Sequence, residues 1–397
     1  MRRVLVVLAL VLAAAACEEE LTVPGGCPEF CPGGQPLLQD TTIYAAPAGD
    51  STFFGYFGWQ DVSSLLVAND FGAGEARAWY RFPPRSDSVT VSDTVRAYTV
   101  DSVVIRMGIV ARDSTVKGLT FSVYQLPLTV DTTTDVPALD AMMTPDALVG
   151  NIVVPDSVYR GSVQLVLKDS SLARLVIPPA DSGRLVLGFR IGDAKATGAR
   201  LGSIQGTTGP AEYTTYVTAD VADTTRRKQQ LALVADANGF AVGGVPPADD
   251  PDLLYIGRVP AARSLLRFEV PKRILDSTSV VRATLELTPM RPWTGLLGDI
   301  TQLEVRPIAV DVGGKSTPVF ALRAVKALPL SGSEVIGIDV IGLIINWRGL
   351  TPLPQALFLS LGPEGGSFQQ PVFGSSRQGD APRLRITYMA PSPVERP

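Results

Sequence analysis

The chain of 397 residues contains no histidine, and this absence excludes much of enzyme chemistry. Histidine is the usual general base at neutral pH, the partner of serine and cysteine nucleophiles, and the commonest ligand of transition metals. The sequence also lacks a Gly-x-Ser-x-Gly motif, and Gly313-Gly314-Lys315-Ser316 is not a phosphate-binding loop because Ala309 replaces its first glycine. We therefore expect a protein that is not an enzyme.

Cysteine is scarce, and the first of the three cysteines follows an export signal. Arg2 and Arg3 precede an apolar run from Val4 to Ala16, which is too short to span a bilayer comfortably. The run ends in Ala-Ala-Ala-Cys, which resembles the bacterial lipobox. This predicts a lipoprotein signal peptide over residues 1–16 and lipid attachment at Cys17. An ordinary secretory signal with an Ala-x-Ala cleavage site is the alternative.

The other two cysteines lie in a segment rich in glycine and proline, which predicts a flexible tether over residues 17–40. Acylation of Cys17 leaves Cys27 and Cys31 as an even pair in an oxidising compartment, so we expect a disulfide between them. Glu18 stands where inner-membrane retention usually needs aspartate. We therefore expect a cell-envelope protein of the outer membrane, facing either the periplasm or the cell surface.

A basic surface is also missing. Removal of Arg2 and Arg3 with the signal leaves 33 basic and 39 acidic residues, a net charge of −6. Such a chain has no electrostatic footprint for nucleic acid. No uncharged apolar run of transmembrane length follows the signal, so the expected contact with the membrane is the lipid anchor.

From Thr41 onward, short runs rich in Val, Thr, Leu and Tyr alternate with turns rich in Gly, Pro, Asp and Ser. Residues 282–287 and 383–388 each alternate polar and apolar side chains, the pattern of a half-buried strand. Helical periodicity is weak, and the chain has 37 glycines and 32 prolines. The pattern predicts an all-β fold.

Two passages of the chain run in parallel. Residues 65–67 and 78–83 match residues 253–255 and 265–271, and the segments that begin at Leu201 and Phe373 end the two halves alike. The repeat predicts two tandem jelly-roll-like antiparallel β-sandwich domains, over residues 41–223 and 230–390, with the break near Thr224–Gln229.

The second half resembles the DNRLRE-type domains, which are jelly-roll-like modules of bacterial surface proteins grouped with carbohydrate-binding modules. The matching segments are Leu265-Leu266-Arg267-Phe268, Val281-Arg282-Ala283-Thr284-Leu285, Ile338-Asp339-Val340 leading to Trp347, and Pro382-Arg383-Leu384-Arg385-Ile386-Thr387-Tyr388. They cover most of residues 230–390. The resemblance implies a noncatalytic module, sometimes polysaccharide-binding, and transfers no ligand site.

Trp347 belongs to an apolar run with Val340, Leu343 and Ile344, so we expect it to pack in a segment that caps the sandwich. A sugar-stacking tryptophan would instead have to be exposed.

An aromatic cluster in the first half is the candidate ligand site. Strand alternation places Phe53, Phe57 and Trp59 on one face and Phe54 and Tyr56 on the other. One set could form a platform for sugar rings or a docking patch, with Phe53, Tyr56 and Trp59 as the candidate residues. Burial between the two domains is the alternative.

Carboxylates offer two further hypotheses. The cluster Asp249-Asp250-Pro251-Asp252 could ligate a structural Ca²⁺, although no recognised calcium loop is present, and we expect no other cofactor or metal. Paired carboxylates could hydrolyse glycosides without histidine. Turn formation explains most of the acidic residues.

These observations predict a noncatalytic envelope lipoprotein, a membrane-tethered module with a binding or structural role. The alternatives are a glycan-binding surface lipoprotein, whose partner is a polysaccharide, an assembly subunit, whose partner is another envelope protein, and a carboxylate-dependent glycosidase.

Overall fold

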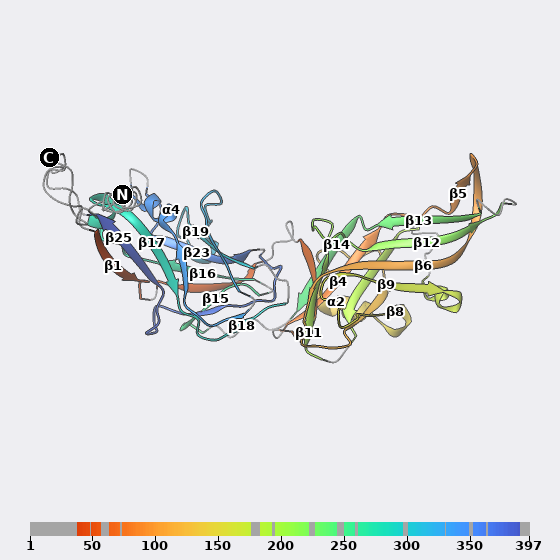
Figure 1. The fold of residues 1–397 in the computed structure, drawn as a ribbon, viewed down its shortest axis with the longest axis horizontal. Helices are drawn as coiled ribbons and strands as arrows, with labels where there is room; N and C mark the ends of the chain where they lie inside the picture. Colours follow the sequence, from red (N-terminus) through yellow and green to blue (C-terminus); the bar gives the residue numbers. More distant parts are fainter. Residues whose placement is uncertain are drawn as a thin grey trace, which may run out of the picture.

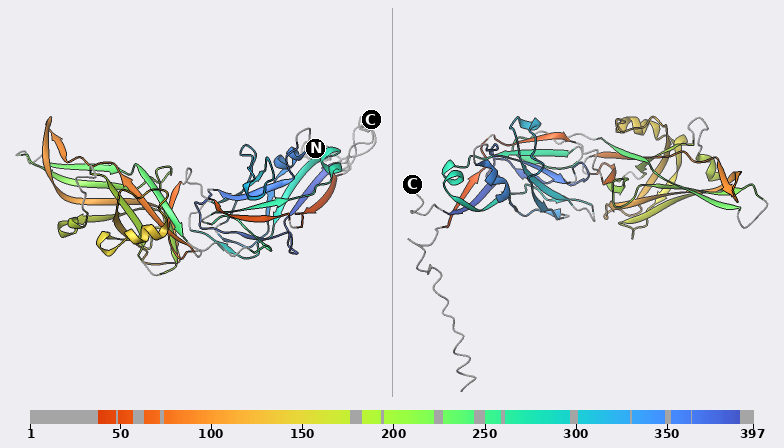
Figure 2. Two further views of the ribbon diagram at one scale, coloured as in Figure 1. Left: turned by 180° about the vertical axis from the view of Figure 1, so that it is seen from behind. Right: turned by 90° about the horizontal axis from the view of Figure 1, so that it is seen from above.

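A computed structural model describes residues 38–389 except 48, 57–62, 72–73, 176–182, 193–194, 222–226, 244–249, 259–260, 297–300, 330, 349–351 and 363. In the described residues, strands dominate, the paired strands run antiparallel, and the helices are short. The predicted all-β class is confirmed. The strands divide into two sets between which no strands pair within the described residues, and we call these sets unit 1 and unit 2. Figures 1 and 2 show them as two lobes arranged end to end.

Unit 1 is one twelve-stranded sheet system that folds back on itself around a core. Its strands are β3 (Ser64–Asn69), β4 (Glu75–Phe82), β5 (Ser88–Val91), β6 (Thr94–Arg112), β7 (Thr120–Leu126), β8 (Leu148–Val153), β9 (Gly161–Lys168), β10 (Leu185–Ile191), β11 (Thr197–Gly202), β12 (Glu212–Ala219), β13 (Lys228–Val234) and β14 (Ala237–Gly243). Its short helices are α2 (Val136–Met142), η1 (Pro145–Ala147) and η2 (Asp169–Arg174).

Unit 2 contains a four-stranded sheet in the order β1-β25-β17-β22 and a five-stranded sheet in the order β2-β16-β23-β19-β20, with two small two-stranded sheets. Its strands are β1 (Leu38–Tyr44), β2 (Ser51–Tyr56), β15 (Leu253–Tyr255), β16 (Ala261–Arg267), β17 (Ser279–Leu287), β18 (Trp293–Thr294), β19 (Gln302–Pro307), β20 (Ala324–Ala327), β21 (Ser331–Gly332), β22 (Ile336–Asp339), β23 (Ala356–Gly362), β24 (Val372–Gly374) and β25 (Arg383–Met389). Its helices are α3 (Lys272–Asp276), η4 (Gly313–Lys315), α4 (Ile341–Ile344) and η5 (Ile345–Trp347).

The two units share one pairing scheme. The pairs β3–β11, β4–β10, β6–β12, β6–β9 and β7–β10 of unit 1 correspond to β15–β24, β16–β23, β17–β25, β17–β22 and β19–β23 of unit 2. Leu65 faces Leu201 in unit 1 and Leu254 faces Phe373 in unit 2, so the strand pairing makes Leu65 equivalent to Leu254, one residue away from the match of residues 65–67 with 253–255. Even a β-bulge recurs, at Asp101 on β6 and at Val281 on β17.

One pair of strands in each unit comes from the other half of the sequence. β13 pairs with β12 and β14 with β4 in unit 1, whereas β1 pairs with β25 and β2 with β16 in unit 2. In Figure 1, the red N-terminal strand β1 therefore lies beside the blue C-terminal strand β25. From Leu38 onward, the chain therefore runs through unit 2, then unit 1, and then unit 2 again.

The predicted domain boundaries, 41–223 and 230–390, do not follow these sheets. Residues 41–56 pair with strands of the second half, and residues 230–243 pair with strands of the first half. The predicted break near Thr224–Gln229 falls at the β12–β13 connection, inside unit 1. Residues 38–40 of the predicted tether already belong to β1. A boundary drawn from sequence assumes that strands close in sequence pair with each other. This assumption fails here, because β1, β2, β13 and β14 each pair with strands of the other half.

Each unit has its own apolar core, which lies inside the folded-back sheet of unit 1 and between the sheets of unit 2. In unit 2, alternation along β16 sends Leu266 and Phe268 inward, while Leu265 and Arg267 point outward. The inward positions of the five-stranded sheet thus belong to the core, and its outward positions form the opposite face, where Leu265 packs in a smaller apolar cluster.

Candidate functional site

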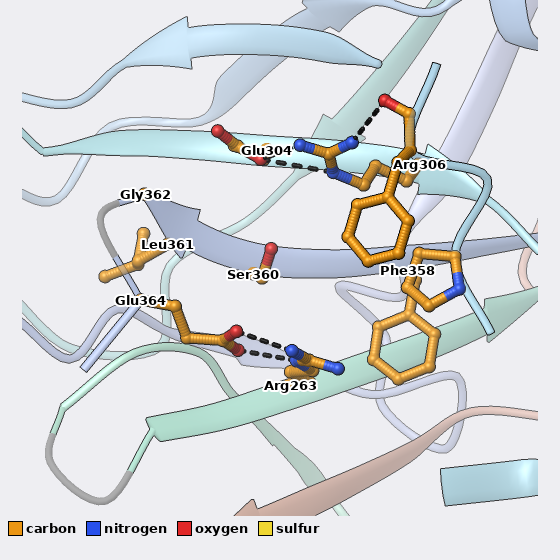
Figure 3. A pocket seen from close by; sticks show the side chains of 10 residues that line it. Arg263, Glu304, Arg306, Phe358, Ser360, Leu361, Gly362 and Glu364 are labelled. Atoms are coloured by element: carbon orange, nitrogen blue, oxygen red, sulfur yellow. Dashed lines mark hydrogen bonds and ion pairs between the residues drawn. The ribbon is translucent and has the colours of Figure 1, made fainter. Parts of the chain in front are cut away.

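The outward face of the five-stranded sheet of unit 2 holds a groove with a volume of about 220 Å³. Strands β16, β23 and β19 supply its floor, and the loops after β19 and β23 supply its walls (Figure 3). The lining residues are Arg263, Glu304, Arg306, Pro318, Phe320, Phe358, Ser360, Leu361, Gly362 and Glu364. We call this the ion-pair groove, because two arginine–glutamate pairs lie in it.

The first pair joins β16 to the loop after β23. Arg263 donates from Nε and Nη2 to the two carboxylate oxygens of Glu364, each at 2.5 Å. Such a two-pronged contact fixes both side chains in one plane. The guanidinium also lies 5.7 Å from the ring centroid of Phe358, so the arginine is held by an ion pair and an aromatic ring together.

The second pair lies on β19. Arg306 donates from Nη2 to Glu304 at 2.7 Å, and Arg323 from the following loop approaches the same carboxylate at 3.4 Å. Arg306 also donates to the carbonyl of Phe320 at 2.7 Å, and its guanidinium lies 5.5 Å from that ring. The Phe320 side chain is 74% exposed, so this wall presents an aromatic face to solvent.

The groove therefore combines guanidinium donors, carboxylate acceptors and exposed aromatic surface within one concave patch. This mixture suits a polar ligand that carries many hydroxyl groups, because it offers donors, acceptors and an apolar face at once. The charges are paired within the chain, so the groove has no strong preference for a bare cation or a bare anion.

The corresponding face of unit 1 is covered. There, α2 and its flanking residues pack on the outward side chains of β4, β7, β10 and β14. Asp135 caps α2 by accepting a hydrogen bond from the backbone N–H of Ala138 at 2.9 Å. Arg77, which precedes Arg81 by four residues as Arg263 precedes Arg267, pairs with Asp140 of α2 at 2.7 Å. The connection between β7 and β8 is longer than the connection between β19 and β20. It thus covers the outward sheet face in unit 1, whereas the equivalent face of unit 2 stays open.

The loop after β19 is anchored at a matched position. Arg267 donates from Nε and Nη2 to Asp311 at 2.5 and 2.7 Å, and this hydrogen bonding lowers the pKa of the Asp311 carboxyl. Arg81 of unit 1 instead donates to the carbonyls of Leu128 and Val130. In both units an arginine of the equivalent strands β4 and β16 therefore holds the loop over the sheet.

Among the described side chains of the predicted aromatic platform, Phe53 lies beside the ion-pair groove. It is the cross-strand partner of Arg263, is half-buried, and packs with Leu265, Ile308 and Phe358. The loop at Gly314 lies over its ring. Phe53 thus packs beneath the loop and offers little of its ring for stacking with a ligand.

The other members of the platform have different outcomes. Phe54 points to the opposite face and contacts Tyr255, with ring centroids 5.8 Å apart. The expected alternation is interrupted at Gly55, where φ is 99° and the register with β16 shifts. Tyr56 is the last residue of β2 but its side chain is not described, and Phe57 and Trp59 lie outside the described residues.

The prediction for Trp347 is confirmed. Its side chain is buried in the core of unit 2, 6.3 Å from the ring of Phe268, and it ends the short helical segment of α4 and η5. Val340, Leu343 and Ile344 are buried beside it. This segment caps the sandwich, so Trp347 offers no surface to a sugar.

The structure gives no further support to a calcium site. Asp249 lies outside the described residues, and Asp250 accepts a hydrogen bond from the backbone N–H of Asp252 at 3.0 Å, as in a turn. Within the described ranges, no group of three or more His, Cys, Asp or Glu residues could hold a metal ion. Cys17, Cys27 and Cys31 all lie before the first described residue.

The groove residues were missed by the sequence analysis. Glu304 and Arg306 are two residues apart on one strand face, which was a signal of an exposed charged pair. Glu364 and Phe320 lie in loops, and no pattern in the sequence indicates that these loops meet Arg263 and Arg306.

No protein-family model matches the chain, and no curated protein matches it in sequence. The resemblance to DNRLRE-type domains therefore stays a prediction. Among the described residues, no helix has the length and apolar character needed to cross a membrane.

Proposed function

We propose that this protein is a noncatalytic lipoprotein of the cell envelope, tethered through Cys17, whose ion-pair groove binds a glycan. The observation that carries the proposal is the contrast between the two units. The same sheet face is covered by α2 in unit 1 and is left open in unit 2, where it holds paired charges and an exposed aromatic ring.

The chemistry of the groove supports a sugar polymer as the ligand. Sugar hydroxyls pair with guanidinium donors and with carboxylate acceptors, and the apolar face of a sugar ring can lie on Phe320.

A carboxylate glycosidase is the rival function, because Glu304 and Glu364 line the same groove. Each of these carboxylates accepts hydrogen bonds from arginine. Glycoside hydrolysis requires one carboxyl to donate a proton and the other to act as base or nucleophile. The paired arrangement favours binding over catalysis.

The test uses the mature chain with Cys17→Ser and follows its retardation in gels that contain bacterial or plant polysaccharides. Phe320→Ala should weaken binding up to about tenfold, the scale of one aromatic contact. Arg263→Ala should weaken it further, because Glu364 loses its partner. Tyr216→Ala removes an exposed aromatic residue of unit 1 and should leave binding unchanged.

Equal binding by all these variants, or no binding to any polysaccharide, would contradict the proposal. Trp59→Ala, measured in parallel, tests the platform predicted from sequence. Release of new reducing ends by the unmodified chain, abolished in Glu304→Gln or Glu364→Gln, would favour the glycosidase.

A further inference from the structure

The segment 38–56, which contains β1 and β2, completes both sheets of unit 2. β1 forms one edge of the four-stranded sheet, and β2 forms one edge of the five-stranded sheet. A single short segment thus contributes an edge strand to each of the two layers of the sandwich. Without it, unit 2 would expose the edges of β25 and β16.

This segment is docked by specific contacts as well as by backbone pairing. The buried carboxylate of Asp50 accepts hydrogen bonds from the backbone N–H and the hydroxyl of Ser376, at 2.5 and 2.8 Å. Arg267 donates to the carbonyl of Gly49 at 2.6 Å, and Thr52 accepts from the backbone N–H of Tyr255 at 3.1 Å. The docking site is therefore shaped for this segment.

Unit 1 shows the same docking contact made by a different segment. Asn238, in β14, accepts a hydrogen bond from the backbone N–H of Ile204 at 2.8 Å, in the turn that matches the turn of Ser376. The strand pair β13–β14 is joined to unit 1 directly through the β12–β13 connection. In contrast, the chain passes through all of unit 1 between segment 38–56 and the other strands of unit 2.

We propose that segment 38–56 is exchangeable, so that a second copy of this chain can supply it to unit 2. The contacts within unit 2 would be the same in the closed monomer and in the exchanged dimer, because the segment that the second copy supplies is identical. Exchange of an identical element is for this reason a low-cost route to dimers. This inference is independent of the proposed glycan binding.

The test uses register partners as cysteine pairs in the full mature chain, with Cys17, Cys27 and Cys31 replaced by serine. One chain carries Thr42→Cys and another carries Arg385→Cys, two residues that face each other on β1 and β25. The chains are mixed, unfolded, refolded and oxidised under mild conditions. Only exchange between copies brings these two cysteines together in register.

The matched control uses Ala232→Cys and Thr214→Cys on separate chains, the equivalent partners on β13 and β12. This pair lies within one hairpin and should give little mixed disulfide. We expect the mixed dimer from Thr42→Cys and Arg385→Cys to exceed the control at least fivefold. Its ratio to monomer should rise about tenfold for a tenfold higher protein concentration.

A mixed-dimer yield equal to that of the control at every concentration would overturn the proposal. A chain that carries both Thr42→Cys and Arg385→Cys provides a second measurement. Its internal disulfide should lock the segment in place and abolish exchange, and reduction should restore it. Circular dichroism confirms that each variant has folded before its dimers are counted.

Discussion

The equivalent outward sheet faces of the two units differ, because one is covered by a helix and the other is exposed. In unit 1, α2 seals the face with an apolar cluster that contains Trp79, Leu139 and Met143. In unit 2, the matching face carries the ion-pair groove. The equivalent strands pair in the same way in both units, and the connection that follows β7 in unit 1 and β19 in unit 2 makes the difference. A repeated sheet can therefore be closed in one copy and open in the other by changing a loop.

The equivalent arginines Arg77 and Arg263 show how the cover by α2 changes the surroundings of a charged side chain. Arg77 has a side chain that is 7% exposed and donates to the carbonyls of Ala68 and Ala76 as well as to Asp140. Arg263 has a side chain that is 23% exposed and pairs with Glu364. The same residue type is thus a buried structural contact in unit 1 and a wall of a groove in unit 2.

Deletion of residues 38–56 should give the largest effect, because it removes an edge strand from each sheet of unit 2. We expect unit 2 to lose more than about 5 kcal/mol of stability, comparable to the total stability of a domain, while unit 1 stays folded. Hydrogen exchange followed by mass spectrometry can report the two units separately, with the undeleted chain as reference. Equal loss of protection in both units would show that the sheets do not define independent folding units.

Substitution of the matched arginines by methionine should give a smaller and asymmetric effect. Arg77→Met leaves buried carbonyls without a donor and should cost about 2–3 kcal/mol, whereas Arg263→Met should cost about 1 kcal/mol or less because its pair is partly exposed. Urea unfolding measures both. Under the proposed function, only Arg263→Met weakens glycan binding. A similar cost for both variants would show that the cover by α2 does not matter.

The smallest effect should come from Asp311, which anchors the open loop. The hydrogen bond from Arg267 lowers the pKa of Asp311 relative to the unfolded chain, so its stabilisation is present above the ordinary pKa of an aspartate. It is lost as the pH falls through the lower pKa of the folded state. Asp311→Asn should therefore cost under about 1 kcal/mol at pH 7 and still less at pH 3, because the pair is partly exposed. Urea midpoints at the two pH values measure this difference, and a cost that grows on acidification would contradict it.

Much of the secondary structure could be read from the sequence. The alternation in residues 282–287 and 383–388 predicted strands that the structure places in β17 and β25. The match of Arg81-Phe82 with Arg267-Phe268 predicted equivalent strands, and the pairings of β4 and β16 agree with that match. The burial of Trp347 also followed from its apolar neighbours. These features depend on local pattern, which a strand carries in its own residues.

The candidate site could not be predicted in the same way. Phe53 was found as part of an aromatic cluster, yet its position beside Arg263 depends on the pairing of β2 with β16 across more than two hundred residues. The bulge at Gly55 changes which aromatic side chains share a face. Glu364 and Phe320 reach the groove through loops, whose paths depend on contacts such as Arg267 with Asp311.

The sequence by itself determined that this chain forms antiparallel strands, that its two halves are alike, and that it lacks the chemistry of histidine. These properties follow from composition and from side-chain periodicity, which act within a few residues. Only the tertiary structure decided that β1 and β2 close unit 2, and that one sheet face is covered while its equivalent is open. Both outcomes depend on which distant edges meet, because backbone hydrogen bonds fix the pairing of strands without regard to their order in the chain.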